Sequence, residues 1–299
     1  MDEKTVKQSR QILRRVQDHI SQAHTAFGVE HETVGFVDVI HHRDNALPSL
    51  NYVTPRRNMA WVSGNHIQQG LDRLQSLDRP ARVYYIEGLF PPPFAKILLD
   101  LGLAAEHQIP LMIYTPTDLS EEPAPPLPRL RHPAGVQTKP VSEQVGNDLW
   151  WCVWRGSDFD VQTLGIEPLH VAADASGRRQ EIDLIMYRQG TPLGIARVSL
   201  QAASQSAHIV ALALQREART PQLTRLLLLA ATKAALARGV SMVFAPGENE
   251  SDRVLCRQLG FIDIGTLVCY AARSGNVNVN ANEVPEHDNP LQPVLALRR

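Results

Sequence analysis

Seven prolines lie between residues 115 and 148, and they constrain this chain more than any other feature. Proline fixes φ and lacks a backbone donor, so such a segment cannot be a continuous helix or a central strand. We therefore predict a linker over 115–148, largely extended, between an N-terminal domain (1–114) and a C-terminal domain (149–273). Residues 274–299 carry several prolines and asparagines and no Phe, Tyr or Trp, which predicts a disordered tail.

The N-terminal domain begins with an amphipathic pattern over residues 4–27. Leu13, Val16 and Ile20 fall on one stripe, which predicts a helix packed on this domain or, alternatively, a dimer contact. Apolar and β-branched runs predict strands at 34–40, 51–54, 61–62, 82–86 and 109–114. Apolar residues at helical spacing predict one helix after Gly64 and a second over 94–101.

The C-terminal domain has a different order of elements. An aromatic run predicts a strand at 149–154, and apolar segments predict strands at 182–188, 193–200 and 208–214. A helix is expected from Pro221 to about Arg238, with Thr220 as its N-cap and Pro221 at its first position. A strand (242–245), a helix (251–259) and a strand (264–272) complete the order.

The two domains share part of their pattern. A helix precedes a strand in both, and Val83 and Met242 stand 19 and 18 residues before Gly102 and Gly260. This spacing suggests a tandem duplication, although strand–helix–strand spacing is common enough to arise by chance.

Composition excludes several classes of protein. The formal net charge is −1, and 43% of residues are hydrophobic, so no attraction to nucleic acid or to a membrane surface is expected. Three cysteines without a paired spacing predict a reducing, cytoplasmic setting, and no signal peptide or apolar span is evident. His31, His41 and His42 lack the spacing of a metal site, so no metal is expected.

The element order and two motifs resemble the GNAT (GCN5-related N-acetyltransferase) superfamily. The first motif is the turn Arg219-Thr220-Pro221-Gln222-Leu223-Thr224, and the second runs from Asn249 to Leu259-Gly260-Phe261. The resemblance implies an α/β fold with a mixed, mostly antiparallel sheet flanked by helices, in two GNAT-like halves. It also implies that acyl-CoA binds where the fourth strand separates from the fifth, with its diphosphate at the start of the next helix.

The resemblance implies a set of coenzyme-binding residues around that helix. They are Leu214, Arg219, Gln222, Leu223, Thr224, Arg225 and Asn249. Gln222 and Thr224 replace the family's small residues and Pro221 removes one N–H, so the alternative is a well-capped core helix with two surface arginines.

Two residues are candidates for the chemistry. Cys256 stands where the family has a tyrosine that protonates the leaving thiolate, and a buried structural cysteine is the alternative. Glu217 is the leading candidate for the general base and His208 the second, with a solvated surface residue as the alternative for each. The segment 51–58, with Tyr52, Arg56 and Arg57, is expected to line a cleft between the halves or to form a solvated loop.

Together with this resemblance, these features predict an N-acyltransferase that uses acetyl-CoA or another acyl-CoA to transfer an acyl group, acetyl in the first place, to an unknown primary amine. The alternative is an inactive GNAT-fold scaffold that works through a protein partner or a homodimer. A thiol enzyme using Cys256 is a third possibility, but no histidine–acid pair accompanies that cysteine.

Overall fold

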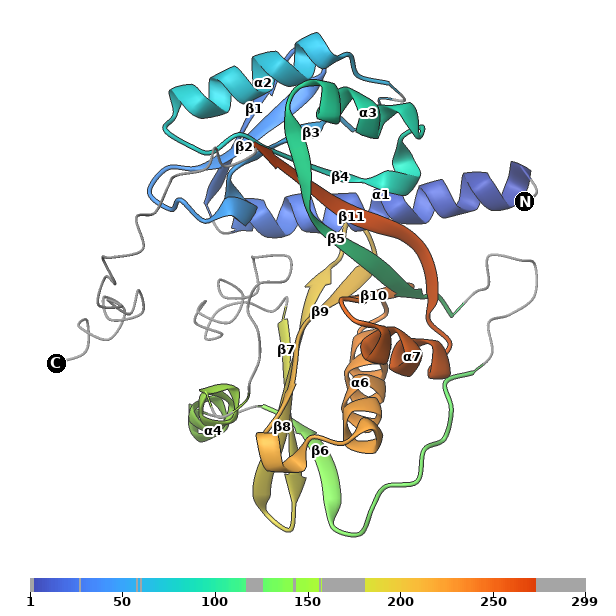
Figure 1. The fold of residues 1–299 in the computed structure, drawn as a ribbon. Coiled ribbons are helices and arrows are strands. Elements are labelled where there is room, and N and C mark those ends of the chain that lie inside the picture. Colours follow the sequence, from blue (N-terminus) through green and yellow to red (C-terminus); the bar gives the residue numbers. More distant parts are fainter. Residues whose placement is uncertain are drawn as a thin grey trace, which may run out of the picture.

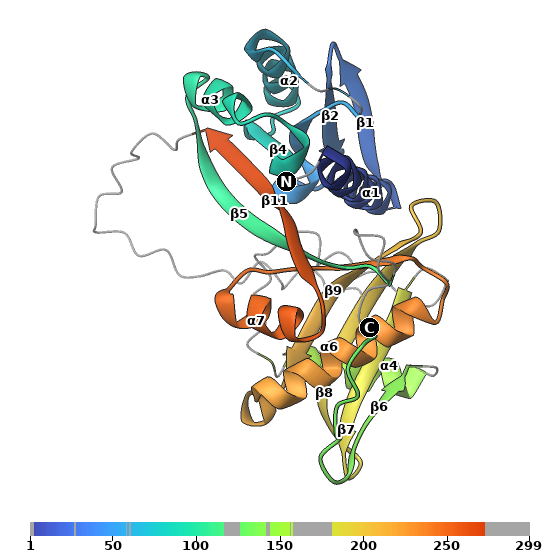
Figure 2. The ribbon, with the colours of Figure 1, turned by 90° about the vertical axis from the view of Figure 1, so that its right-hand side faces the viewer.

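The computed structural model describes residues 3–26, 28–57, 59, 61–116, 126–141, 144–155, 157 and 181–272. In this part of the chain, eleven strands form one sheet in the order β1-β2-β3-β4-β11-β5-β10-β9-β8-β7-β6. Helices cover both faces of the sheet (Figures 1 and 2). We call residues 3–116 the N-half and residues 126–272 the C-half. The predicted tail at 274–299 lies outside the described residues.

The N-half begins with the predicted amphipathic helix and follows it with strands and two further helices. The hairpin of β1 (Val29–Val34) and β2 (Val37–His42) replaces the single strand predicted at 34–40. Gly35, with φ of +58°, makes the turn that a continuous strand cannot contain. Residues 61 and 62 are not in a strand, contrary to prediction. The remaining elements are α1 (Glu3–Ala26), η1 (Pro48–Leu50), β3 (Tyr52–Pro55), α2 (Gly64–Ser76), β4 (Arg82–Ile86), η2 (Glu87–Leu89), α3 (Pro93–Asp100) and β5 (Leu103–Tyr114).

The C-half follows the predicted order after its first element. Its strands and helices are β6 (Val136–Pro140), α4 (Gln144–Arg155), β7 (Glu181–Arg188), β8 (Thr191–Gln201), β9 (Ser206–Leu214), η3 (Arg216–Ala218), α6 (Pro221–Leu236), β10 (Met242–Pro246), α7 (Glu250–Gln258) and β11 (Ile262–Ala272). Strand β6 lies inside the predicted linker and pairs only with β7, at the edge of the sheet. Proline is compatible with an edge strand, so the proline-rich segment is not extended linker throughout.

The aromatic segment 149–154 is helical rather than a strand. Trp150 and Val153 are fully buried against Ile185 and Ile195, and a spacing of three places them on one face of α4. Trp150 stacks on Trp154 one turn later, with ring centroids 5.6 Å apart. Aromatic residues favour strands, but here packing on the sheet decides the conformation.

The two halves exchange their last strands. β4 pairs with β11, which comes from the C-half, and β10 pairs with β5, which comes from the N-half. β5 and β11 also pair with each other, antiparallel, along almost their whole length. In Figure 1 the two strands run side by side through the centre of the molecule, joining the two halves.

Helix α1 packs on both halves, not only on the first as predicted. Its Leu13 and Val16 are buried in a core cluster with Phe244 of β10. The Arg15 guanidinium donates to Ser204 O at 2.9 Å and to Ser241 Oγ at 2.7 Å, both in the C-half. None of the described helices is long and apolar enough to cross a bilayer.

Candidate functional site

A cleft opens in the C-half where two parallel strands separate. β9 and β10 pair over three residues each, and the last pair is His208 with Phe244. Directly after it, β9 has a bulge: Val198 of β8 lies opposite Ile209, but Arg197 lies opposite Ala211, so Val210 is the extra residue. A bulge bends its strand, and this one lies where β9 leaves β10.

The cleft has a volume of about 100 Å³ and is mostly apolar. Helices α6 and α7 supply one side of it and the diverging strands the other. Its lining residues are Ile209, Val210, Ala211, Leu212, Thr224, Leu228, Ala245, Pro246, Glu248, Asp252, Leu255 and Cys256.

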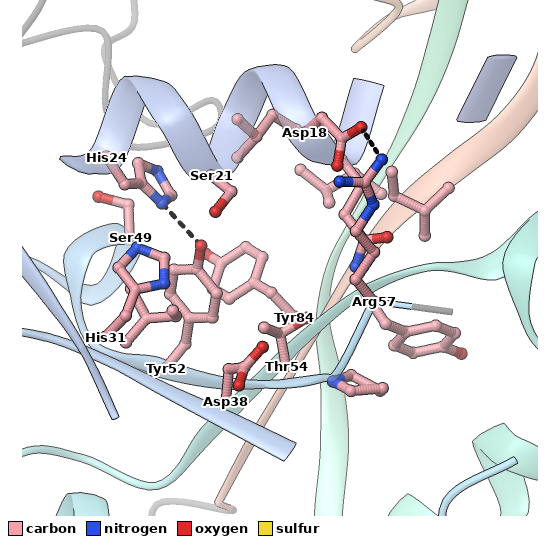
Figure 3. Close-up of a pocket in the computed structure, with 17 residues that line it drawn as sticks. Asp18, Ser21, His24, His31, Asp38, Ser49, Tyr52, Thr54, Arg57 and Tyr84 are labelled. Carbon is pink, nitrogen blue, oxygen red and sulfur yellow. Dashed lines mark hydrogen bonds and ion pairs between the residues drawn. The ribbon is translucent and has the colours of Figure 1, made fainter. Parts of the chain in front are cut away.

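A second pocket lies in the N-half, between α1 and strands β2, β3 and β4 (Figure 3). β3 and β4 are also parallel, and they share the single register pair Val53–Val83. The pocket has a volume of about 110 Å³, and residues from α1 and from both strands line it. Tyr52, Thr54 and Arg57 belong to the lining, so the segment 51–58 does line a pocket, although under α1.

Polar contacts organise this N-half pocket. The Asp18 carboxylate and the Arg57 guanidinium are 2.8 Å apart. Tyr52 Oη lies 2.7 Å from His24 Nδ1. Burial raises the pKa of Asp18, although Arg57 opposes the shift, and burial lowers the pKa of His31.

Solved structures share this fold. A GCN5-related N-acetyltransferase from Kribbella flavida superposes with a TM-score of 0.69 at 17% identity, over 89% of this chain and 97% of that one. The chain has a GNAT fold. No protein-family model matches the sequence, and no curated protein matches it significantly.

Two further GNAT structures are similar at lower scores. One is the tandem GNAT protein from the clavulanic acid biosynthesis pathway, with a TM-score of 0.56 and 15% identity over 92% of this chain and 96% of that one. The other, a GCN5-related N-acetyltransferase from Sphaerobacter thermophilus, has a TM-score of 0.56 and 14% identity over 79% and 76%. The tandem GNAT protein matches both halves, as the sequence resemblance predicted.

The turn predicted to bind the diphosphate lies at the amino end of α6, but two of its backbone N–H groups already donate hydrogen bonds to Thr220. Thr220 caps the helix: its Oγ1 accepts from the Leu223 N–H at 3.3 Å, and its carbonyl accepts from the Thr224 N–H at 3.0 Å. Pro221 contributes no N–H. Among the N–H groups of Gln222, Leu223 and Thr224, this leaves that of Gln222 outside the cap contacts.

Of the predicted coenzyme-binding residues, Thr224 lines the cleft, whereas Gln222 and Arg225 line a neighbouring groove between α6 and α7. Arg219 is close enough to Asp252 to lower that residue's pKa, against the larger effect of burial, which raises it. Arg225 donates to Gln258 Oε1 at 2.9 Å. Asn249 is the N-cap of α7, where its Oδ1 accepts from the Asp252 N–H at 2.9 Å. Asn249 therefore orders the helix that carries Asp252 into the cleft.

Of the two predicted catalytic residues, the structure brings Cys256 into the cleft and leaves Glu217 outside. Cys256 is 3% exposed, and burial raises the pKa of its thiol to about 12. Glu217 is exposed in η3, beyond the end of β9, and does not line the cleft. Leu214, at the same end of β9, pairs with Gly194 and is also absent from the lining.

His208 is not the surface residue that the sequence interpretation allowed. It is 1% exposed, and its ring stacks on Phe244 with centroids 4.5 Å apart, at the last β9–β10 pair. It faces His19 of α1, on the side of the sheet opposite α6 and α7.

Sequence reasoning missed Asp252 and Glu248, both of which line the cleft. Asp252 was detectable, because it stands four residues before Cys256 and shares its helix face. Within the described residues, no three His, Cys, Asp or Glu side chains gather as a metal site would require.

Proposed function

We propose that the protein is an acyl-CoA-dependent N-acyltransferase that transfers an acyl group, acetyl being the smallest, to a primary amine. The observation that carries the proposal is the C-half cleft, where β9 leaves β10 at the Val210 bulge. Its apolar walls suit the narrow arm of the coenzyme, and the amino end of α6 with Arg219 and Arg225 suits the diphosphate.

The proposed reaction is direct attack of the amine nitrogen on the thioester carbonyl. A C–N bond forms, the C–S bond breaks, the amine loses a proton and the thiolate gains one. Backbone amides at the bulge, beside Val210, would polarise the carbonyl oxygen. Holding both reactants in one cleft supplies much of the rate.

Two side chains in the cleft are suited to the proton transfers. Cys256 stays a thiol at neutral pH and is assigned as the proton donor to the leaving thiolate, although its raised pKa makes it a weaker acid than an exposed thiol. Asp252 is the carboxylate that we assign as base in place of Glu217. Its raised pKa makes it a stronger base than an exposed aspartate.

Binding of acetyl-CoA tests the proposal directly. At about 100 times Kd, binding should stabilise the protein by ~2.7 kcal/mol, measured by chemical denaturation. Thr224→Trp places a ring in the cleft and should abolish the stabilisation. Lys233→Trp, on an exposed position of the same helix, is the matched control and should keep it. Release of free thiol with a panel of amines then tests turnover.

The alternative, a GNAT-fold scaffold without transfer activity, has a specific observation in its favour. The Thr220 cap binds the N–H groups of Leu223 and Thr224, and Pro221 has no N–H, so few donors remain to hold a diphosphate. In addition, Gln222 and Thr224 carry side chains where small residues are usual. Absence of stabilisation by acetyl-CoA and by longer acyl-CoAs would favour this alternative. Binding without thiol release would mean that the fold keeps the coenzyme but not the chemistry.

A further inference from the structure

The N-half pocket combines an apolar floor with a small number of polar groups. Ile40, Ile86 and Leu267 supply apolar surface beneath α1. The rings of Tyr52 and Tyr84 lie side by side on the same face, with centroids 4.9 Å apart. An apolar pocket with a few convergent polar groups is the usual form of a small-molecule site.

Asp38 is one of the two carboxylates that line this pocket, and it lies between Tyr52 and Thr54. It extends from β2 toward the space beneath α1, and Ser21 points down from the helix on the other side (Figure 3). Thr33 Oγ1 donates to Asp38 Oδ1 at 2.9 Å, and Arg56 Nε lies 3.8 Å from the same oxygen. Both of these contacts therefore use one of the two carboxylate oxygens.

The charge of the lining favours a cation. Asp18 and Arg57 neutralise each other at 2.8 Å, which leaves Asp38 as the remaining formal charge among the acidic and basic lining residues. The contact between Asp38 and Arg56 is long, and the Arg56 side chain is 46% exposed, so solvent screens it. Burial lowers the pKa of His31 and so favours its neutral form.

We propose that this pocket binds a small primary ammonium ligand with an apolar or aromatic body. The ammonium group donates to Asp38 and lies against the electron-rich faces of Tyr52 and Tyr84. The apolar body occupies the floor. At about 110 Å³ the pocket is somewhat smaller than the roughly 150 Å³ cavity that holds benzene in another protein, and its open side accommodates the remaining atoms.

This site is separate from the acyl-CoA cleft, which lies in the other half of the chain. The inference does not rest on the proposed function, because amine binding here requires no coenzyme. Its test is therefore made without any acyl-CoA, and its outcome leaves the transferase proposal untouched.

Three ligands of similar shape but different charge test whether the pocket prefers a cation. Isothermal titration at neutral pH should show that benzylamine binds at least about tenfold more tightly than the neutral isostere benzyl alcohol, a difference of ~1.4 kcal/mol. Benzoate should bind more weakly than both. Equal binding of the amine and the alcohol, or no binding of benzylamine, would overturn the proposal.

Three variants locate the site. Asp38→Asn keeps an acceptor for Thr33 and should cost about tenfold in benzylamine affinity while leaving benzyl alcohol unaffected. Asp100→Asn makes the same charge change at an exposed position and should alter neither. Ser21→Trp fills the pocket from above and should abolish binding of both ligands. Full benzylamine affinity in Asp38→Asn, or in a folded Ser21→Trp protein, would show that the ligand binds elsewhere.

Discussion

Residues 1–116 produced alone are expected not to fold, because β11 is missing from them. β11 supplies three buried side chains to the N-half core: Leu267 against the α1 side, and Val268 and Tyr270 on the side of α2 and α3. It also pairs with both β4 and β5, so its removal leaves two strand edges unpaired in the middle of the sheet.

The magnitude follows from this burial. Burying one large apolar side chain contributes ~1.5–3 kcal/mol, so these three account for about 5–9 kcal/mol. The whole net stability of a domain is typically about 5–15 kcal/mol. The loss is therefore of the same size as the stability itself, before the unpaired edges are considered.

The assay compares the fragment with the intact chain by near-ultraviolet circular dichroism and urea unfolding. The fragment should lack both a near-ultraviolet signal and a cooperative transition. Co-expression with residues 117–299 should restore both, because that fragment carries β11. A cooperative transition in residues 1–116 alone would refute the reasoning, since it would mean that the N-half closes its sheet without the exchanged strand.

Three further results are expected. Ellman's reagent at mildly alkaline pH should modify exposed Cys152 quickly in the native protein and the two other cysteines only after unfolding, because both are buried and burial raises the pKa of each thiol to about 12. In urea unfolding, Asp183→Asn should destabilise the protein by about 3–5 kcal/mol, because it leaves the 1%-exposed Arg197 without a carboxylate that binds it through two 2.6 Å hydrogen bonds. The double variant Asp183→Leu with Arg197→Met should cost much less. The pKa of His31 is lower in the folded than in the unfolded chain, so the unfolded chain binds more protons near pH 6. The free energy of unfolding should therefore fall as the pH drops through about 6.5, the pKa of histidine in the unfolded chain. Urea titrations across this pH range should show a smaller fall for His31→Gln.

Much of the fold was predictable because its signals are local. The stripe of α1, the Thr220–Pro221 start of α6 and the apolar strands β7 to β9 are each specified by residues close together in sequence. The GNAT resemblance rested on such signals, and the structure confirms the fold. A short motif also drew attention to Cys256, which the structure places in the lining of the C-half cleft.

Features that depend on distant residues were not predictable. The sequence specifies β5 and β11 as strands, but nothing local determines that each pairs with the other half's strand. The 149–154 segment has aromatic residues that suit a strand, and its helical form depends on sheet residues about 30 to 60 positions away. The N-half pocket combines Asp18, Asp38 and Tyr84 from three separate elements, so no short sequence motif could predict it.

Helix α1 contacts both halves of the chain close to their candidate sites. His24 contacts Tyr52 beside the N-half pocket, while His19 contacts Ser206 at the start of β9, the strand whose departure from β10 forms the C-half cleft. Five residues, or ~1.4 helical turns, separate these two contacts. A ligand that moves α1 at the N-half pocket therefore also moves the contact of α1 with β9. Ligand binding at the N-half pocket is then expected to change ligand binding at the C-half cleft.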